Sequence, residues 1–243
     1  MMPTFGSLFS GIGGMDLGLE RAGFECRWQV EIDPFCQRVL AKHWPDVKRY
    51  GDVRMVGEEL EPVDLICGGF PCQPHSVAGA RRASEDERDL WPEFARLIRL
   101  LKPRGVLAEN VRGLLSSEDG RFFGRVLRDL AERGYDAEWS VLRAADVGAP
   151  HQRARVFLLA HNSGDRIQGM LEEPFPRFPG FSWCENVRGV EDLRNRPGVP
   201  EPLLWGSRNG FPDYVDRIKA LGNSVVPQVA EAIGQRIFEV MYG

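Results

Sequence analysis

A cysteine follows a short apolar run early in the chain, within the segment CGGFPCQPHSVAG at residues 67–79. The run 63–67 is typical of a buried strand, and two glycines end it. Prolines stand on both sides of Cys72 and restrict the backbone that carries it. A thiol held on such a loop, just beyond a strand, is placed as a nucleophile would be. The alternative is a tight turn in which the cysteine is incidental.

A glycine-rich turn and two carboxylates predict a site for a nucleoside cofactor. The turn at 11–14, GIGG, follows the apolar segment 4–9 and precedes a helical stretch. Glu31 lies 20 residues beyond Gly11, at the end of the next expected strand, where a carboxylate commonly holds ribose hydroxyls. Asp52 closes the third expected strand and could accept a hydrogen bond from an adenine amino group.

The type of cofactor is argued from Asp16, in the first turn of the helix after the glycines. A pyrophosphate at that helix terminus needs free N–H groups and no competing anion. The acid therefore disfavours NAD and favours a cofactor with positive charge. S-adenosylmethionine, which carries a sulfonium and an ammonium group, fits this requirement.

Two further groups could act on a substrate. Glu109 ends an otherwise apolar strand, where partial burial would raise its pKa and allow it to protonate a ring nitrogen. Strand alternation would place Arg153 and Arg155 on one face, where two guanidinium groups need anions or acceptors. The alternatives are a carboxylate that caps the next element and a solvated strand edge.

Strands and helices are expected to alternate along the chain. The expected strands are 4–9, 25–31, 47–50, 63–67, 105–111, 135–142 and 155–160, and the expected helices are 15–22, a run after 34, 90–101, 122–133, 214–221 and 228–242. This alternation predicts an α/β fold with a doubly wound, mostly parallel sheet. Ligands of such sheets bind at the carboxyl ends of the strands, which is where the motifs above lie.

The composition and the periodicity of the sequence change between about residues 162 and 210. Prolines cluster there, aromatic residues alternate with them, and hydrophobic periodicity is lost. The pattern indicates a small irregular insertion. We therefore divide the chain into 1–161, 162–210 and 211–243, the last being the segment in which regular helix returns.

Composition bounds the class of protein. The chain has 243 residues, and its 43% hydrophobic content suffices for a globular core. A signal peptide pattern and an apolar stretch of membrane-spanning length are both missing, so we expect a soluble, cytoplasmic protein without a membrane partner. Five scattered cysteines without a CxxC pair indicate neither a disulfide framework nor a zinc cluster, and we expect no metal. The net charge of -4 argues only weakly against nucleic acid, because basic residues can line one cleft.

Taken together, the motifs resemble those of the DNA (cytosine-5) methyltransferase family, of bacterial or phage type. They occur in the family's order: FSGIGGMDLGLERAGF, EID at 31–33, GDV at 51–53, GGFPCQPHS, ENV at 109–111, the arginine pair at 153 and 155, and LGNSVVP at 221–227. The resemblance covers about residues 4–160 and 212–240. His75 stands where the family usually has Phe, and His151 where it usually has Gln.

The resemblance implies a Rossmann-like fold that transfers a methyl group from S-adenosylmethionine to carbon 5 of cytosine in DNA. The base would be flipped out of the duplex and joined covalently to Cys72. Glu109 would act at N3 of the base, and Arg155, supported by Arg153, would hold the base oxygen. Residues 1–161 would form the catalytic domain, 162–210 a short target-recognition segment, and 211–243 a return to the catalytic domain.

The resemblance also implies which residues bind the ligands. Those implied for the cofactor are Phe9, Gly11, Gly13, Gly14, Glu31, Ile32, Asp52, Val53, Pro71, Leu90 and Asn223. Those implied for DNA are Gln73, Ser76, Arg81 and Arg82, on the loop after Cys72. The partner would be double-stranded DNA, with a cognate restriction endonuclease acting separately, and we expect a monomer.

Three other functions remain open from the sequence. A tRNA cytosine-5 methyltransferase of the same fold would use the same chemistry. A catalytically weak DNA-binding module would require a broken motif, whereas Cys72, Glu109 and Arg155 are all present. A NAD-dependent oxidoreductase would leave Cys72 and the turn at Asn223 unexplained.

Overall fold

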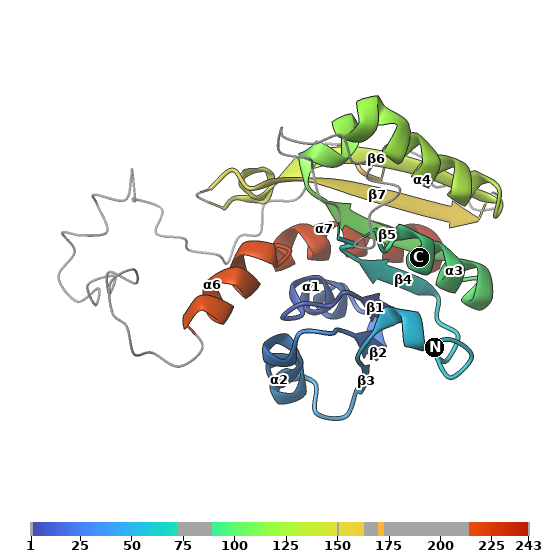
Figure 1. Cartoon of the computed structure of the whole chain (residues 1–243). Helices are drawn as coiled ribbons and strands as arrows, with labels where there is room; N and C mark the ends of the chain where they lie inside the picture. The colour runs from blue at the N-terminus through green and yellow to red at the C-terminus, as the bar shows by residue number, and fades with distance from the viewer. Residues whose placement is uncertain (1, 72–88, 150, 163–169, 173–213, 243) are drawn as a thin grey trace, which may run out of the picture.

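The structure is a computed structural model that describes residues 2–71, 89–149, 151–162, 170–172 and 214–242 (Figure 1). Within these residues strands and helices alternate along the first two thirds of the chain. The strands are β1 (Thr4–Leu8), β2 (Glu25–Val30), β3 (Lys48–Tyr50), β4 (Leu65–Gly68), β5 (Gly105–Asn110), β6 (Tyr135–Arg143) and β7 (Ala154–Asn162). The α-helices are α1 (Gly14–Arg21), α2 (Pro34–His43), α3 (Trp91–Leu101), α4 (Arg121–Ala131), α6 (Tyr214–Asn223) and α7 (Pro227–Tyr242).

All seven strands form one sheet in the order β3-β2-β1-β4-β5-β7-β6. The pairs from β3 through to β5 are parallel, and β7 runs antiparallel to both of its neighbours. The predicted α/β fold with a mostly parallel sheet is therefore confirmed. Because β7 is reversed, its first residues lie at the same sheet edge as the carboxyl ends of the parallel strands.

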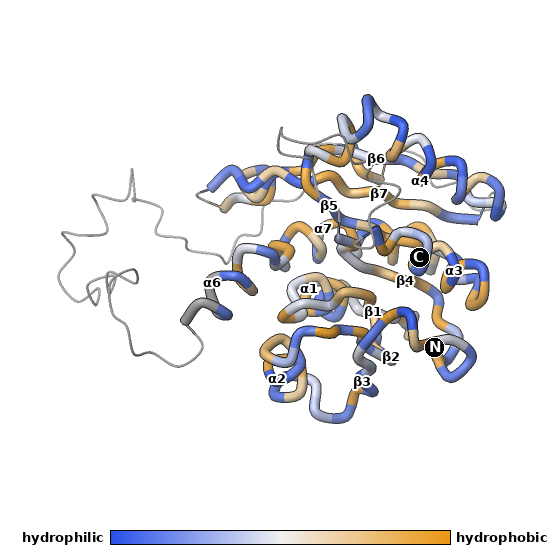
Figure 2. The backbone as a smooth tube through the Cα atoms, in the orientation of Figure 1, coloured by the Kyte–Doolittle hydropathy of each residue, from blue (hydrophilic) through white to orange (hydrophobic). Residues whose placement is uncertain are grey.

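Helices cover both faces of the sheet (Figure 1). On one face α3 and α4 contribute Trp91, Phe94 and Val126 to a core that includes residues of β4 and β5. On the other face Leu19 of α1 packs with Ile233 of α7. Figure 2 shows the corresponding hydropathy, with hydrophobic colour along the central strands and hydrophilic colour in the outer helices and loops. Strands buried on both faces explain the continuous apolar runs in the sequence.

Local signals explain where the elements near the sheet edge begin. Asp33 caps α2, since its carboxylate accepts hydrogen bonds from the backbone N–H groups of Phe35 and Cys36, and Pro34 occupies the first helical position. Two 3₁₀ segments, η1 (Val53–Met55) and η3 (Arg112–Gly120), follow β3 and β5, and a third, η4 (Ala144–Val147), joins β6 to β7. None of the helices in the described part of the chain is long and apolar enough to cross a membrane.

Candidate active site

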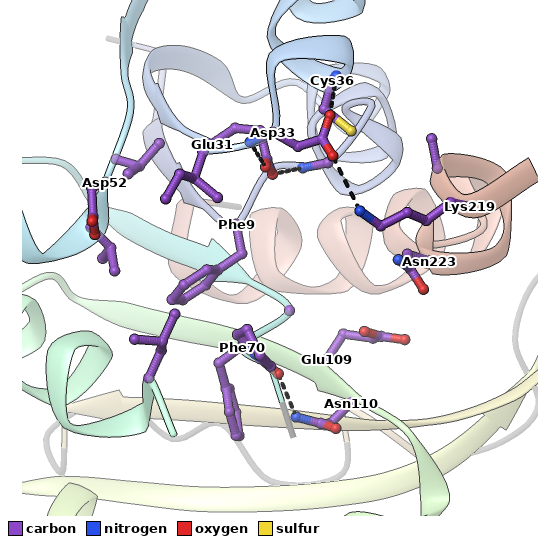
Figure 3. Close-up of a pocket in the computed structure, with 18 of the residues that line it drawn as sticks. Phe9, Glu31, Asp33, Cys36, Asp52, Phe70, Glu109, Asn110, Lys219 and Asn223 are labelled. Carbon is purple, nitrogen blue, oxygen red and sulfur yellow. Dashed lines mark hydrogen bonds and ion pairs between the residues drawn. The ribbon is translucent and has the colours of Figure 1, made fainter. Parts of the chain in front are cut away.

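A cavity of about 530 Å³ opens at the carboxyl edge of the parallel strands (Figure 3). Its lining comes from the ends of β1 to β5, from the start of β7 and from α6. The lining residues are Phe9, Gly11, Val30, Glu31, Ile32, Asp33, Cys36, Gly51, Asp52, Val53, Arg54, Gly69, Phe70, Pro71, Leu90, Glu109, Asn110, Val111, Arg155, Asp216, Lys219, Ala220 and Asn223. Nine of the eleven residues implied for the cofactor are among them.

The chain leaves β1 through an unusual backbone conformation. Phe9 has φ 53°, in the left-handed region that a phenylalanine rarely adopts. Its ring stacks against Phe94 of α3, with centroids 6.3 Å apart, and lies toward the middle of the cavity (Figure 3). Gly11 follows with φ 57°, a value that glycine adopts without strain. Strained residues persist where the surroundings hold them, and they cluster at functional sites.

Glu31 holds two loops in place beside the cavity, the loop that follows β1 and the loop that follows β2. One carboxylate oxygen accepts a hydrogen bond from the backbone N–H of Gly11 at 2.7 Å, and the other from the N–H of Asp33 at 2.8 Å. Each oxygen keeps a further lone pair. The partly exposed carboxylate is thus held in place with acceptor capacity left for a ligand.

The remaining glycines of the turn do not line the cavity. A Cβ on Gly13 would lie 2.4 Å from the Trp44 ring, and one on Gly14 would lie 2.3 Å from the carbonyl oxygen of Val225. Gly13 and Gly14 therefore permit close packing of α1 against α2 and against the turn before α7. The structure does not bring them to the cavity, although the family resemblance implied that they bind the cofactor.

The interpretation of Asp16 is wrong. Its carboxylate is fully buried beneath the glycine turn, where it accepts hydrogen bonds from Ser7 Oγ at 3.0 Å and Gln29 Nε2 at 2.8 Å. Burial raises its pKa to about 6, although these two hydrogen bonds oppose the rise. Asp16 joins α1 to β1 and β2 and does not face the cavity, so it gives no reason to choose between cofactors.

Asp52 lies at the opposite end of the cavity from α6 (Figure 3). Its carboxylate caps η1 and forms an ion pair with Arg54, with Oδ2 and the guanidinium nitrogen 2.6 Å apart. The hydrogen bonds from the Arg54 side chain and backbone hold the pKa of Asp52 below its usual range. Val53, the next residue in the chain, also lines the cavity, as does Ile32, which has 62% of its surface exposed. This end offers apolar contacts together with an ionised acceptor.

Glu109 lies at the end of β5 with only 7% of its surface exposed. Its Oε1 is 3.0 Å from Nε of Arg155, which enters the site because β7 is antiparallel. The N–H groups are not aligned with Oε1, which has no directed hydrogen bond among the described residues. Burial raises the pKa of Glu109 to about 7, although Arg155 and Arg153 lower it. Near neutral pH this carboxyl group can therefore act as an acid.

The backbone after β4 passes directly beside Glu109. A Cβ on Gly69 would lie 3.0 Å from Glu109 Oε2, so a larger residue there would displace the carboxyl group. Asn110 holds this backbone in place, because its Nδ2 donates to the carbonyl oxygen of Phe70 at 2.9 Å. Pro71 then lines the cavity. Asn110 was part of the ENV motif but was not among the candidate site residues.

The described residues stop at Pro71 and resume at Asp89. Outside the described residues lie Cys72, Gln73, His75, Ser76, Arg81 and Arg82, together with 163–169 and 173–210 of the expected target-recognition segment. Asp89 accepts a hydrogen bond from the N–H of Trp91 at 3.1 Å and forms an ion pair with Arg125 of α4. Asp89 thus fixes Leu90 at the cavity wall. Sequence reasoning missed Arg125, which stands 36 residues from its partner.

Arg153 precedes β7 instead of belonging to it, so the expected strand alternation with Arg155 is wrong. Its φ is 21°, and its guanidinium donates to the carbonyl oxygens of Gly222, at 2.8 Å, and Ser224. Burial and the nearby Arg155 lower its pKa. Arg153 therefore supports the turn that carries Asn223, while Arg155 itself lines the cavity.

Helix α6 closes the side of the cavity opposite Asp52 (Figure 3). Asn223 was expected there, whereas Lys219 and Asp216 were not. The ammonium of Lys219 lies 3.4 Å from Asp33 Oδ2, which links α6 to the start of α2. The position of Lys219 one helical turn before Asn223 could have indicated that it lines the cavity, but not that it contacts Asp33.

Comparisons with known proteins agree with this geometry. The model of the family described as C-5 cytosine-specific DNA methylase matches residues 3–199. The chain is 41% identical to the type II methyltransferase M.NgoMIV of Neisseria gonorrhoeae, with 96% of each protein covered. It is 33% identical to the type II methyltransferase M.HgiCII of Herpetosiphon aurantiacus, covering 93% of this chain.

Some of the relatives are longer than this chain. The chain spans 51% of M.HgiCII. A crystal structure of a prophage-encoded E. coli protein described as a DNA modification methyltransferase superposes with a TM-score of 0.61 and 30% identity, covering 71% of this chain and 51% of its own. The matched family model and the extent of identity confirm the resemblance seen in the motifs. The chain belongs to the C-5 cytosine-specific DNA methylase family.

Proposed function

We propose that the chain transfers the methyl group of S-adenosylmethionine to carbon 5 of a flipped cytosine, with Cys72 as the covalent nucleophile. The observation that carries the proposal is a single cavity that combines two kinds of group. Glu31 and Asp52 line one part of it, and the Glu109–Arg155 pair, next to Pro71, lines another.

The described residues fit the cofactor. Glu31 keeps acceptor lone pairs for a ribose diol, and Ile32 and Val53 offer apolar contacts to a purine beside Asp52. The acids Glu31, Asp33, Asp52 and Asp216 outnumber Arg54 and Lys219, the cations paired with two of them, and this excess of carboxylates suits a cationic ligand. When bound, S-adenosylmethionine supplies an electrophilic methyl group on its sulfonium.

The part of the cavity lined by Glu109 and Arg155 would activate the cytosine ring. Carbon 5 is a poor nucleophile, so the Cys72 thiolate would first form a bond to carbon 6. Glu109 would donate its proton to N3 as this bond forms, and Arg155 would donate a hydrogen bond to the base oxygen. Carbon 5 of the resulting enamine would then bond to the methyl carbon as the bond from that carbon to the sulfonium sulfur breaks. Loss of the carbon 5 proton to solvent would restore the double bond between carbons 5 and 6 and release Cys72 as its thiolate, and N3 would return its proton to Glu109.

The reaction requires the base to leave the helix, because both faces of the ring are stacked within a duplex. The part of the cavity lined by Glu109 and Arg155 lies at the sheet edge. Pro71, which directly precedes Cys72 in the sequence, lines the cavity, and Asp89 holds the start of α3 where the described chain resumes. A tRNA substrate, which the sequence left open, is not favoured by the family match, which names DNA.

The proposal is tested by methyl transfer from labelled S-adenosylmethionine to duplex DNA, to RNA and to no acceptor. We expect label in carbon 5 of DNA cytosine only. Equal labelling of tRNA would replace the DNA substrate by RNA, and no labelling of any acceptor would contradict enzymatic activity.

The target sequence is predicted to be short, two to four base pairs, or relaxed around the methylated cytosine. The segment 162–210 contains six arginines and seven acidic residues, so it is not a basic clamp. Each bidentate base contact contributes only about 1–3 kcal/mol of discrimination. Bisulfite sequencing of plasmid methylated in vitro measures the motif, and a strict motif of about six or more base pairs would contradict the prediction. We further propose that a cognate endonuclease acts separately and that the protein is a monomer.

A further inference from the structure

Lys219 lies on the rim of the cavity and is only loosely paired. Its side chain is 63% exposed, and its Nζ is 3.4 Å from Asp33 Oδ2. Asp33 uses its other carboxylate oxygen to cap α2. Burial would raise the pKa of Asp33, but the capped N–H groups and Lys219 together lower it. The pair is therefore charged, and an ammonium group with three donors can contact a second anion while it keeps Asp33.

Lys219 differs from the two other cations among the described lining residues. Arg54 is paired with Asp52 at 2.6 Å, and Arg155 with Glu109 at 3.0 Å, each by a guanidinium group. Both arginines have a close carboxylate partner within the wall of the cavity. Lys219 has the longest of the three ion pairs. It is therefore the cation best able to bind an anionic group that enters with a ligand.

The position of Lys219 identifies which part of the ligand would meet it. In Figure 3, Asp52 and Lys219 lie on opposite sides, with Glu31 between them and Glu109 across the cavity from Glu31. An adenosyl group with its purine toward Asp52 and its ribose at Glu31 would extend its amino-acid end toward α6. Lys219 and Asn223, one helical turn apart, line that side.

We infer that Lys219 binds the α-carboxylate of the methionine part of the cofactor, with Asp33 and Asp216 beside it to receive the α-ammonium group. This inference rests on the proposed function, and it assigns the orientation of the ligand, that is, which of its ends lies at α6. The exposed lysine and the acids of α2 and α6 together match the zwitterion at that end of the ligand. The methyl group, which is attached nearer the ribose, would then point across the cavity toward Glu109.

The test compares S-adenosylmethionine with an analogue that lacks only the carboxylate and with a thioether that lacks the whole amino-acid end. Calorimetry would measure the affinities of S-adenosylmethionine, its decarboxylated analogue and 5′-methylthioadenosine for the parent and for Lys219→Met. A partly exposed charge-assisted contact should make the parent bind S-adenosylmethionine about five- to tenfold more tightly than the decarboxylated analogue. Lys219→Met should remove this preference and leave the affinity for 5′-methylthioadenosine unchanged. Lys219→Arg, which keeps the positive charge, should show a preference close to that of the parent.

The ratio between the two ligands separates recognition from structural damage. If Lys219 merely held α6 in place, Lys219→Met would weaken both ligands equally, and that result would overturn the inference. Lys42→Met, an exposed lysine of α2 outside the cavity lining, should keep the parent's ratio.

Glu31→Ala serves as the matched control for the ribose. It removes a charge-assisted acceptor that all three ligands would share, so each affinity should fall at least about tenfold while their ratios persist. If the parent itself binds none of the three, the proposed function fails. If the parent binds them without any dependence of the ratio on Lys219, only the present inference fails.

Discussion

Replacement of Cys72 by Ala is expected to abolish methyl transfer, with a loss of at least about 10⁴-fold in rate. At about 1.36 kcal/mol for each tenfold change, this loss corresponds to more than about 5 kcal/mol of transition-state stabilisation. The reason is that the proposed mechanism needs a thiolate to saturate the bond between carbons 5 and 6. Burial raises the pKa of Cys36, the thiol that lines the cavity among the described residues, to about 12, so it would stay protonated. Affinity for S-adenosylmethionine should stay near that of the parent, because Glu31 and the rest of the lining are unchanged.

Covalent trapping provides the direct measurement. Duplex DNA containing 5-fluorocytosine cannot lose its substituent at carbon 5, so the parent should form an adduct that survives denaturation. Cys26→Ala is the matched control, because Cys26 is buried in the core, outside the cavity lining, and burial raises its pKa. The control should form the adduct, and an adduct with Cys72→Ala would show that the nucleophile is elsewhere.

The sheet and most of its edge could be predicted from the sequence, for a physical reason. Parallel strands buried on both faces appear as continuous apolar runs, and the chemical groups come directly after those runs. Glu31, Asp52 and Glu109 follow or end β2, β3 and β5, and all three line one cavity. Local pattern and topology agree here, because a parallel sheet gathers its strand ends at one edge.

The sequence failed where the direction of a side chain depends on distant packing. Asp16 stands in the first turn of α1, but it points down onto Ser7 and Gln29 and away from the cavity. Arg153 was expected in a strand, but the positive φ at that residue turns its guanidinium toward the turn before α7. Neither direction follows from spacing alone.

Contacts between remote segments were also not predictable. Lys219 meets Asp33, which stands 186 residues earlier, and Arg125 meets Asp89 across the start of α3. Such pairs depend on how α6 and α4 pack, and periodicity gives no information about it. They lie at the ends of the elements that position Leu90 and Asn223, so they affect the site without belonging to any motif.

Replacement of Glu109 by Gln is expected to lower the rate of methyl transfer about 10²- to 10³-fold. Glutamine keeps a hydrogen-bond donor near N3 but cannot give up a proton, so the loss measures proton transfer. Single-turnover rates give the value. A variant that keeps the parent's rate within about threefold would show that a hydrogen bond to N3 suffices.

The pH dependence separates the acid role from damage to the site. Because burial raises the pKa of Glu109 to about 7, the parent should lose its acid form, and with it rate, as the pH rises through that value. The residual rate of Glu109→Gln should lack this descending limb. If the limb persists in the variant, another group is responsible for it.

The same pKa predicts the sign of a stability effect that does not require turnover. Folding raises the pKa of Glu109 from 4.5 to about 7, so the native state binds the extra proton within that interval. The parent should therefore lose stability relative to Glu109→Gln as the pH rises from about 4.5 through about 7, by at most about 3 kcal/mol. Asp16 has a raised pKa of the same sign, but it is present in both proteins and cancels in the difference. Urea unfolding of both proteins at about pH 4.5 and pH 8 measures this difference, and a constant difference would mean that Glu109 is not held protonated by its surroundings.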